Sequence, residues 1–179
     1  DAILTNDSSI VDGKGIGDPT EFALVEMGRK ATVDENLLRE LMPRLEEIPF
    51  DSDRKLMSTK YELHDVPTVL TKGALDVLLD RTANIRLEDG IREITQADKD
   101  AILQKNLEFS QEGLRVLAFG YKEVPEDYTL SLDNENGFTF LGLISMMDPP
   151  REESKAAVAD AKRAGIKPVM ITGDPKIPA

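Results

Sequence analysis

The spacing of apolar residues in the first third of the chain predicts two helices. Asp18-Pro19-Thr20-Glu21 has the chemistry of a helix start, with Asp as the N-cap, Pro in the first turn and Glu reaching back, and apolar residues follow it. We therefore expect a helix over about residues 19–29. A second, shorter helix is expected after Asp34, and Pro43 marks its end because proline cannot continue a helix; its apolar positions are Leu37, Leu38 and Leu41.

From residue 57 the apolar period changes to two, which is the period of a half-buried β-strand. Residues 57–63 and the β-rich run 67–71 together predict a hairpin. Residues 74–81 have a helical pattern. Asp89-Gly90 predicts a tight turn between short polar strands, and Thr95 with Asp98 predicts the start of a longer helix that Gly113 ends.

The last third of the chain predicts a change of architecture. Residues 114–124 and 138–147 have the composition of strands, the second of them buried, and the segment between them is polar and rich in turn residues. Asp148-Pro149-Pro150 predicts a hinge or domain boundary, because two successive prolines stiffen the backbone and remove two donors. A helix over 151–164 and a strand over 166–171 follow, an order typical of parallel sheets. The pattern predicts an α+β domain over 1–147 and a short α/β fragment over 148–179.

Composition narrows the classes of partner. The 179 residues include 34 acidic and 22 basic side chains, and the net charge of −12 repels nucleic acid and anionic membrane surfaces. The absence of cysteine and the single His64 argue against the usual metal sites, and they fit a reducing cytosol. The longest apolar run, 140–147, is far shorter than the roughly 20 residues that span a bilayer. We expect the chain by itself to cross no membrane, and we interpret both of its ends as internal to a longer protein.

The standard phosphate-binding loops are missing from the sequence. Gly13-Lys14-Gly15-Ile16-Gly17 has the wrong spacing for a Walker or a Rossmann loop and is interpreted as a flexible loop. A nucleotide would therefore be held by side chains spread across the sheet. Phe50, Lys55 and Met57 combine an aromatic face, a cation and a thioether, which suits adenine. The alternatives are a core phenylalanine, a solvated basic pair and a methionine that fills a core gap.

Three further segments could contact phosphate. Lys72 and Gly73 lie at a strand end before a predicted helix, although an ordinary turn with an exposed lysine fits equally well. Arg115 lies in an apolar strand, where a charge needs a partner or must face solvent. Thr172-Gly173-Asp174 follows a predicted parallel strand, where ligands bind, but it is also common turn sequence. The capping role of Glu21 requires no ligand.

In this order the segments closely resemble the type II P-type ATPases, the calcium pumps and their sodium-, potassium- and proton-pumping relatives. Residues 17–24 resemble the family's Gly-Glu/Asp-Pro-Thr-Glu-x-Ala-Leu, and residues 50–58 resemble Phe-Ser-x-x-Arg-Lys-x-Met-Ser. Lys72-Gly73-Ala74 and residues 113–118 resemble Lys-Gly-Ala and Gly-Leu-Arg-Val-Leu-Ala. Residues 148–151 and 170–174 resemble Asp-Pro-Pro-Arg and Met-Ile-Thr-Gly-Asp. Six motifs in the same order cover nearly the whole chain.

The resemblance implies an antiparallel sheet flanked by helices, the nucleotide-binding domain of a cation pump, with calcium as the expected ion. Phe50 would stack on adenine, Met57 would pack beside the base, and Lys72 with Gly73 would line its pocket. Glu21 and Lys55 would contact the nucleoside and Arg115 the phosphates. Asp148 and Arg151 would belong to the hinge, and the γ-phosphate and Mg²⁺ would be held with the help of Thr172, Gly173 and Asp174.

The same resemblance implies a cytoplasmic domain of an integral protein of the cell membrane, whose partners are ATP and the phosphorylation, actuator and transmembrane domains of the pump. The motif Asp-Lys-Thr-Gly-Thr, which supplies the phosphorylated aspartate, is absent from this sequence. We therefore expect binding without turnover, no catalytic residue in this chain, and a Kd for ATP of roughly 0.1–1 mM.

Two segments of the chain depart from the family's motifs, and two other functions are considered as alternatives. Asp51-Ser52 replaces the serine and arginine common in calcium pumps, and residues 175–179 differ from His-x-x-Thr-Ala. The first rival is a fragment of a haloacid-dehalogenase-like phosphatase, which requires an Asp-x-Asp pair after a strand. The second is an acidic protein-interaction module, which predicts no response to ATP at Phe50 or Arg115.

Overall fold

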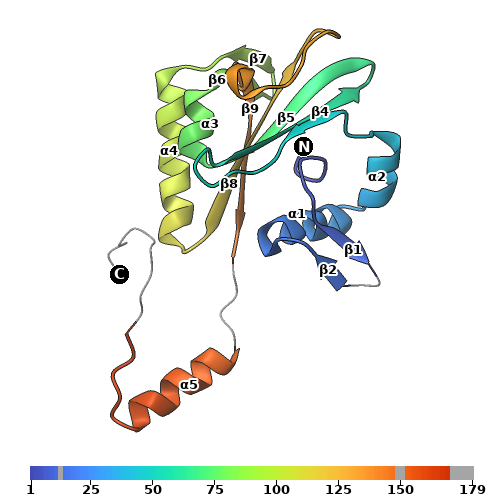
Figure 1. The fold of residues 1–179 in the computed structure, drawn as a ribbon. Helices are drawn as coiled ribbons and strands as arrows, with labels where there is room; N and C mark the ends of the chain where they lie inside the picture. The colour runs from blue at the N-terminus through green and yellow to red at the C-terminus, as the bar shows by residue number, and fades with distance from the viewer. Residues whose placement is uncertain (12–13, 148–151, 170–179) are drawn as a thin grey trace.

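The computed structural model describes residues 1–11, 14–147 and 152–169. Its helices and strands follow one another along the chain as Figure 1 shows. In chain order they are β1 (Ser9–Val11), β2 (Lys14–Ile16), α1 (Pro19–Lys30), α2 (Glu35–Leu41), β3 (Glu46–Ile48), β4 (Leu56–Leu63), β5 (Val66–Gly73), α3 (Leu75–Asp80), β6 (Thr82–Leu87), β7 (Gly90–Glu93), α4 (Gln96–Gln111), β8 (Arg115–Glu123), the 3-10 turn η1 (Leu132–Asn134), β9 (Phe138–Met146) and α5 (Glu152–Arg163).

The main sheet has the strand order β3-β4-β5-β8-β9-β6-β7. Its neighbouring strands are antiparallel, as expected, except that β6 and β9 run parallel. Parallel neighbours require a long connection, and β7, α4 and β8 lie between these two strands in the sequence. The architecture is therefore the predicted α+β class, with a mixed rather than purely antiparallel sheet.

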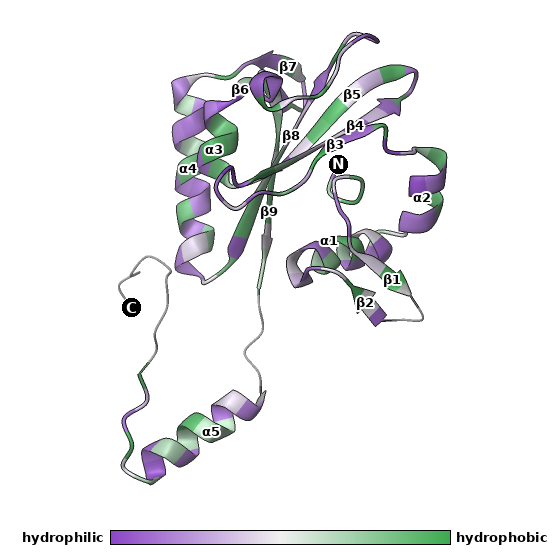
Figure 2. Ribbon diagram, in the orientation of Figure 1, coloured by the Kyte–Doolittle hydropathy of each residue, from purple (hydrophilic) through white to green (hydrophobic). Residues whose placement is uncertain are grey.

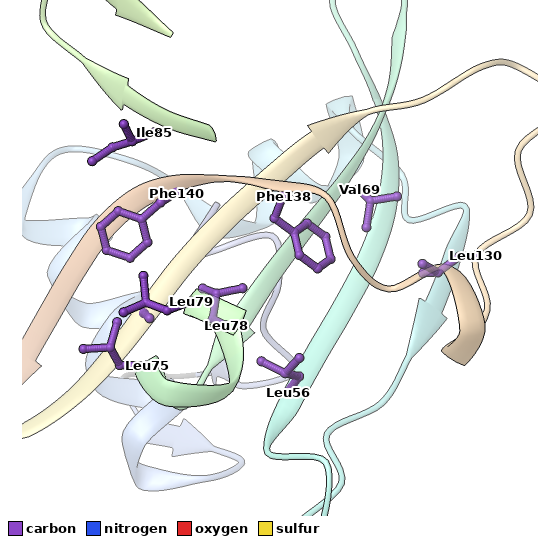
Figure 3. Packing of buried hydrophobic residues seen from close by; sticks show 10 residues of the cluster. Leu56, Val69, Leu75, Leu78, Leu79, Ile85, Leu130, Phe138 and Phe140 are labelled. Carbon is purple, nitrogen blue, oxygen red and sulfur yellow. The ribbon is translucent and has the colours of Figure 1, made fainter. Parts of the chain in front are cut away.

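Helices α3 and α4 cover one face of the sheet (Figure 1), and the main core lies between α3 and the sheet (Figure 3). Helix α3 is strongly apolar, whereas α4 carries many polar residues (Figure 2). Leu78 of α3 and Phe138 of β9 are fully buried, and both belong to the same cluster. The cluster consists of Leu56, Val69, Leu75, Leu78, Leu79, Ile85, Ala118, Leu130, Phe138 and Phe140.

The N-terminal segment, with α1, α2 and the β1–β2 hairpin, lies over the opposite face (Figure 1). Leu4, Tyr61 and Leu70 form a second buried cluster there, against which Leu38 and Met42 pack. Residues 56–61 of β4 are consequently buried on both faces. The prediction of a half-buried strand was wrong, because the sequence period could not show that a second layer covers the polar face.

Local capping follows the predictions. The Asp18 side chain accepts hydrogen bonds from the amides of Thr20 and Glu21 at the start of α1, and Asp34 caps α2 in the same way. Thr95 and Asp98 form a reciprocal capping box at α4. The hairpin β4–β5 and the turn at Asp89-Gly90 between β6 and β7 are also confirmed.

Two predicted segments differ in detail. The segment interpreted as a flexible loop contains strand β2, which pairs with β1; a side chain at Gly15 would meet the ring of Phe22 at 2.4 Å, so the hairpin packs closely on α1. Strand β9 is buried only over residues 138–140 and is partly exposed beyond them. The prediction of a wholly buried strand was therefore wrong for its second half.

The C-terminal part is described over residues 152–169, which comprise α5 and the segment after it. Helix α5 agrees with the helix predicted over 151–164. Residues 166–169 form no strand, in contrast to the prediction over 166–171, of which 170 and 171 lie outside the described residues. A strand requires a hydrogen-bonded neighbour, and apolar composition alone does not supply one. Within the described ranges, no helix is both long and apolar enough to cross a membrane.

Candidate functional site

The candidate site is centred on an ion pair between Lys72 and Glu21. Lys72 Nζ lies 2.5 Å from Glu21 Oε1. Leu70 of β5 belongs to the cluster under the N-terminal layer, and side chains two residues apart on a strand share a face. Lys72 therefore faces the N-terminal layer rather than α3. Only 5% of Lys72 is exposed, so its ammonium group depends on Glu21 for compensation.

Glu21 is held by the segment that precedes β1. Its Oε2 accepts hydrogen bonds from the amide of Asp7 at 3.0 Å and from Ser8 Oγ at 3.4 Å. Asn6 Nδ2 donates to the Glu21 carbonyl at 2.8 Å. The carboxylate thus joins the N-terminal segment to the sheet instead of reaching back to the helix cap, and that part of the capping prediction was wrong.

Met57 and Phe119 flank Lys72 on the same face of the sheet. Both are its register partners, on β4 and β8 respectively. Met57 is 1% exposed and Phe119 is 4% exposed. An ammonium group is therefore bordered by a thioether and an aromatic side chain, a combination that suits a flat, partly apolar and hydrogen-bonding ligand.

Gly73 brings β5 against the loop before β4. The carbonyl oxygen of Lys55 accepts a hydrogen bond from the amide of Ala74 at 3.0 Å. A Cβ at Gly73 would lie 2.1 Å from that oxygen, so a side chain has no room. Lys55 itself has a φ of 58°, in the left-handed region, which completes a tight turn before the strand.

The loop over residues 49–55 presents Phe50 to solvent, with 60% of the residue exposed. Asp51 Oδ1 accepts hydrogen bonds from the amides of Asp53 and Arg54 at 3.0 and 2.9 Å, so Asp51 organises this turn. Phe50 is thus not a core residue, which removes the main alternative to a role in ligand binding.

Arg115 occupies the first position of β8 and is exposed. Its Nη1 donates to Thr20 Oγ1 at 2.7 Å, and Thr20 is the neighbour of Glu21 in α1. The arginine therefore faces solvent and has a polar partner, the two alternatives that the sequence left open for a charge in an apolar strand. The contact brings it beside the same helix turn that holds the Lys72 ion pair.

Burial lowers the pKa of Lys72 below its ordinary value, while the hydrogen bond and charge of Glu21 oppose that change. The charge of Asp7 acts in the same direction as Glu21, and the charge of Arg44 adds to the lowering. Burial thus disfavours the charged form of Lys72, and Glu21 is the main group that favours it.

The structure thus brings together Glu21, Met57, Lys72, Gly73 and Arg115, with Lys55 touching Gly73 through its backbone. Phe50 is exposed on the loop that Lys55 ends. The other predicted site residues lie outside the described residues: Asp148, Arg151, Thr172, Gly173 and Asp174. Sequence reasoning did not single out Ser8 or Glu135. Ser8 belongs to no recognisable motif. Glu135 lies 81 residues from its partner Arg54, so only the folded structure shows that the two side chains interact.

A hollow lies at the end of the β4–β5 hairpin opposite to Lys72. Its volume is about 310 Å³, and it is lined in part by Leu63, Val66, Leu70 and Tyr121. None of the site residues predicted from the sequence lines it.

Comparison with known proteins identifies the class of this domain. Residues 1–153 match the family described as P-type ATPase, cytoplasmic domain N. The match spans the main sheet, its two covering layers and the ion pair of Glu21 with Lys72. The chain belongs to the P-type ATPases, and its similarity is to their cytoplasmic domain N.

Individual relatives make the resemblance more specific. The chain is 46% identical over 180 residues to a calcium-transporting ATPase of Listeria monocytogenes, covering 99% of this chain and 20% of that protein. It is 45% identical to calcium-transporting ATPase 1 of Lactococcus lactis and 41% identical to calcium-transporting ATPase 1 of Bacillus cereus, covering 99% and 97% of this chain. The chain spans 20% of the length of each of these relatives.

Proposed function

We propose that this chain binds ATP with Mg²⁺ and presents the γ-phosphate to an aspartate elsewhere in a parent pump, which transports calcium. The proposal rests on the buried Lys72 ammonium beside Met57, Phe119 and Glu21. A lysine in such surroundings can donate to a purine edge while the apolar neighbours contact the ring. The calcium assignment is supported by the names of the relatives.

The aromatic ring of Phe50 would stack on the adenine from the exposed loop. Arg115, beside Thr20, would extend the site toward the phosphates and offset part of their charge. Stacking and a few partly exposed cations offset little more than the cost of immobilising ATP, which is the reason for the expected Kd of roughly 0.1–1 mM.

Phosphate chemistry would need parts that the described residues do not contain. Among the described residues, no group of three or more acidic or histidine side chains could hold a metal ion. Mg²⁺ would therefore reach this site with the nucleotide, and Thr172, Gly173 and Asp174 would assist when the domains close. The proposal also includes a domain boundary near residue 148, with Asp148 and Arg151 in the hinge. It further includes that the whole unit lies on the cytoplasmic side of the membrane.

An NMR titration with ATP tests the binding site. We expect saturable shifts in the wild-type chain, with affinity weakened at least severalfold in Lys72→Ala and in Phe50→Ala. Lys30→Ala is the matched control, because Lys30 is an exposed lysine at the end of α1. Its affinity should equal that of wild type. Phosphate release by the isolated chain should stay at the background level.

Unchanged wild-type spectra at about 10 mM ATP would contradict the proposal, since that concentration is at least tenfold above the expected Kd. The acidic-module interpretation predicts that result. If Lys72→Ala showed shifts that saturate with the wild-type affinity, the nucleotide would have to bind elsewhere on the chain.

A further inference from the structure

A buried carboxylate lies under the loop of residues 49–55, on the opposite side of the sheet from Lys72. Glu135 is 1% exposed. Its Oε1 lies 2.5 Å from Arg54 Nη1 and accepts a hydrogen bond from Ser58 Oγ at 2.5 Å. Its Oε2 accepts from Arg81 Nη1 at 3.0 Å. One carboxylate therefore ties together the 49–55 loop, β4 and the end of α3.

Arg54 is the member of this cluster that reaches the loop backbone. One terminal nitrogen of its guanidinium contacts Glu135, and the other donates to the carbonyl oxygen of Pro49. Pro49 immediately precedes Phe50, and Lys55 immediately follows Arg54. The side chain of Arg54 thus closes the loop back onto its first residue, Pro49, while Phe50 is exposed to solvent.

The cluster has an energetic reason to be rigid. The Arg54 side chain is 11% exposed and that of Glu135 is 0% exposed, so neither charge can return to water while the pair is intact. A buried charge that loses its partner is strongly destabilising, and the alternative conformations of the loop are therefore disfavoured. Only residues 51–53 separate Phe50 from Arg54, so fixing the position of Arg54 also restrains the position of Phe50.

We propose that Arg54, held by Glu135, is a positioning residue that sets the 49–55 loop, and with it Phe50, in place for the adenine end of the nucleotide. This inference rests on the proposed function. The cluster of Arg54, Glu135, Ser58 and Arg81 does not itself contact the ligand. Its contribution is preorganisation, because a loop that is already ordered loses less entropy on binding.

Arg81 provides a matched comparison, because it contacts the same carboxylate but not the loop. The experiment measures the Kd of ATP and of AMP, the urea midpoint, and amide hydrogen exchange over 49–55 for wild type, Arg54→Gln and Arg81→Gln. We expect Arg54→Gln to weaken both nucleotides by about fivefold and to speed exchange in the loop, whereas Arg81→Gln leaves both Kd values within about twofold of wild type. Both variants should lower the urea midpoint.

The phosphate end supplies a further contrast. Arg115→Ala should weaken ATP but leave AMP nearly unchanged, whereas Arg54→Gln should weaken both alike. If Arg54→Gln does not fold, Arg54→Lys replaces it, since lysine keeps the charge near Glu135 but lacks the fork that reaches Pro49.

Three outcomes overturn the inference. Wild-type Kd values in Arg54→Gln or its replacement would remove the positioning role while leaving the proposed function intact. Equal losses in the Arg54 and Arg81 variants would show a general effect of stability. An absence of ATP binding by the wild-type chain would instead overturn the proposed function, and the inference with it.

Discussion

Lys72 of β5 and Glu21 of α1 form an ion pair that joins the sheet to the N-terminal layer, with Nζ 2.5 Å from Oε1. The two residues are 51 positions apart in the sequence. Glu21 is also bound by Asp7 and Ser8, so one carboxylate orients the lysine and fastens the segment that covers this face of the sheet. Removing the Glu21 carboxylate should affect both the charge of the site and the packing of the N-terminal segment on the sheet.

The titration of Lys72 tests this coupling. Its pKa is lowered from the ordinary value of 10.5 by burial, against the opposing effect of Glu21. Between the lowered pKa and 10.5 the unfolded chain binds more protons than the folded chain, so the contribution of Lys72 to the free energy of unfolding rises with pH in that window. Glu21→Gln should lower the pKa of Lys72 further.

A ¹³Cε NMR titration of the lysines measures this pKa directly. Glu26→Gln is the control, because Glu26 is an exposed carboxylate on the same helix. A Lys72 midpoint equal to that of the exposed lysines would show that burial does not govern this group.

Gly73 should tolerate no side chain. In Gly73→Ala the new Cβ would lie 2.1 Å from the carbonyl oxygen of Lys55, and the backbone of the site would have to move. Gly142→Ala is the matched control, since Gly142 has a similar φ of 154° but no atom within 4 Å of its Cβ position. We expect Gly73→Ala to lower the free energy of unfolding by about 2 kcal/mol more than the control. Urea denaturation gives the comparison, and equal losses would mean that backbone conformation alone matters there.

Leu78 anchors α3 in the main core, where it is 0% exposed. Leu78→Ala should cost about 3 kcal/mol, from lost transfer energy together with the cavity that remains. Leu37→Ala, at a position that is 54% exposed, should change the free energy of unfolding by no more than about 0.5 kcal/mol. Thermal and urea unfolding both measure the difference. A small loss in Leu78→Ala would indicate that the sheet and α3 can close over the cavity.

The start of α4 makes stability sensitive to acid. The pKa of Asp98 is lowered strongly below 3.8, first by its hydrogen bond with Arg92 and then by Thr95. Because the folded-state pKa is lowered, the contribution of Asp98 is complete above about 3.8 and is lost as the pH falls through the lowered value. Arg92→Gln should raise this pKa toward 3.8.

Carboxyl NMR titration of Asp98 checks that shift. Lys105→Gln is a suitable control, because Lys105 pairs with Glu108 further along the same helix. The Asp98 midpoint should not change in that variant. If Arg92→Gln also left it unchanged, the capping hydrogen bonds from Thr95 would be the dominant cause.

The sequence alone determined the local structure and the family resemblance. Helix starts at Asp18, Asp34 and Thr95 depend on hydrogen bonds that span only a few residues, and the turn at Asp89-Gly90 is equally local. These features were therefore predictable from short windows. The order of the motifs carried the functional prediction, which no single motif supported by itself.

Tertiary structure decided which of those residues meet and which faces are buried. The second face of β4 is covered by the N-terminal layer, and Glu21 binds Lys72 rather than its own helix cap. Glu135 binds Arg54 across 81 residues, and β6 and β9 pair in parallel. Each of these depends on long-range packing, whose direction and partners are not encoded in the period of a segment. The apolar run after residue 165 illustrates the same limit, because a strand exists only beside another strand.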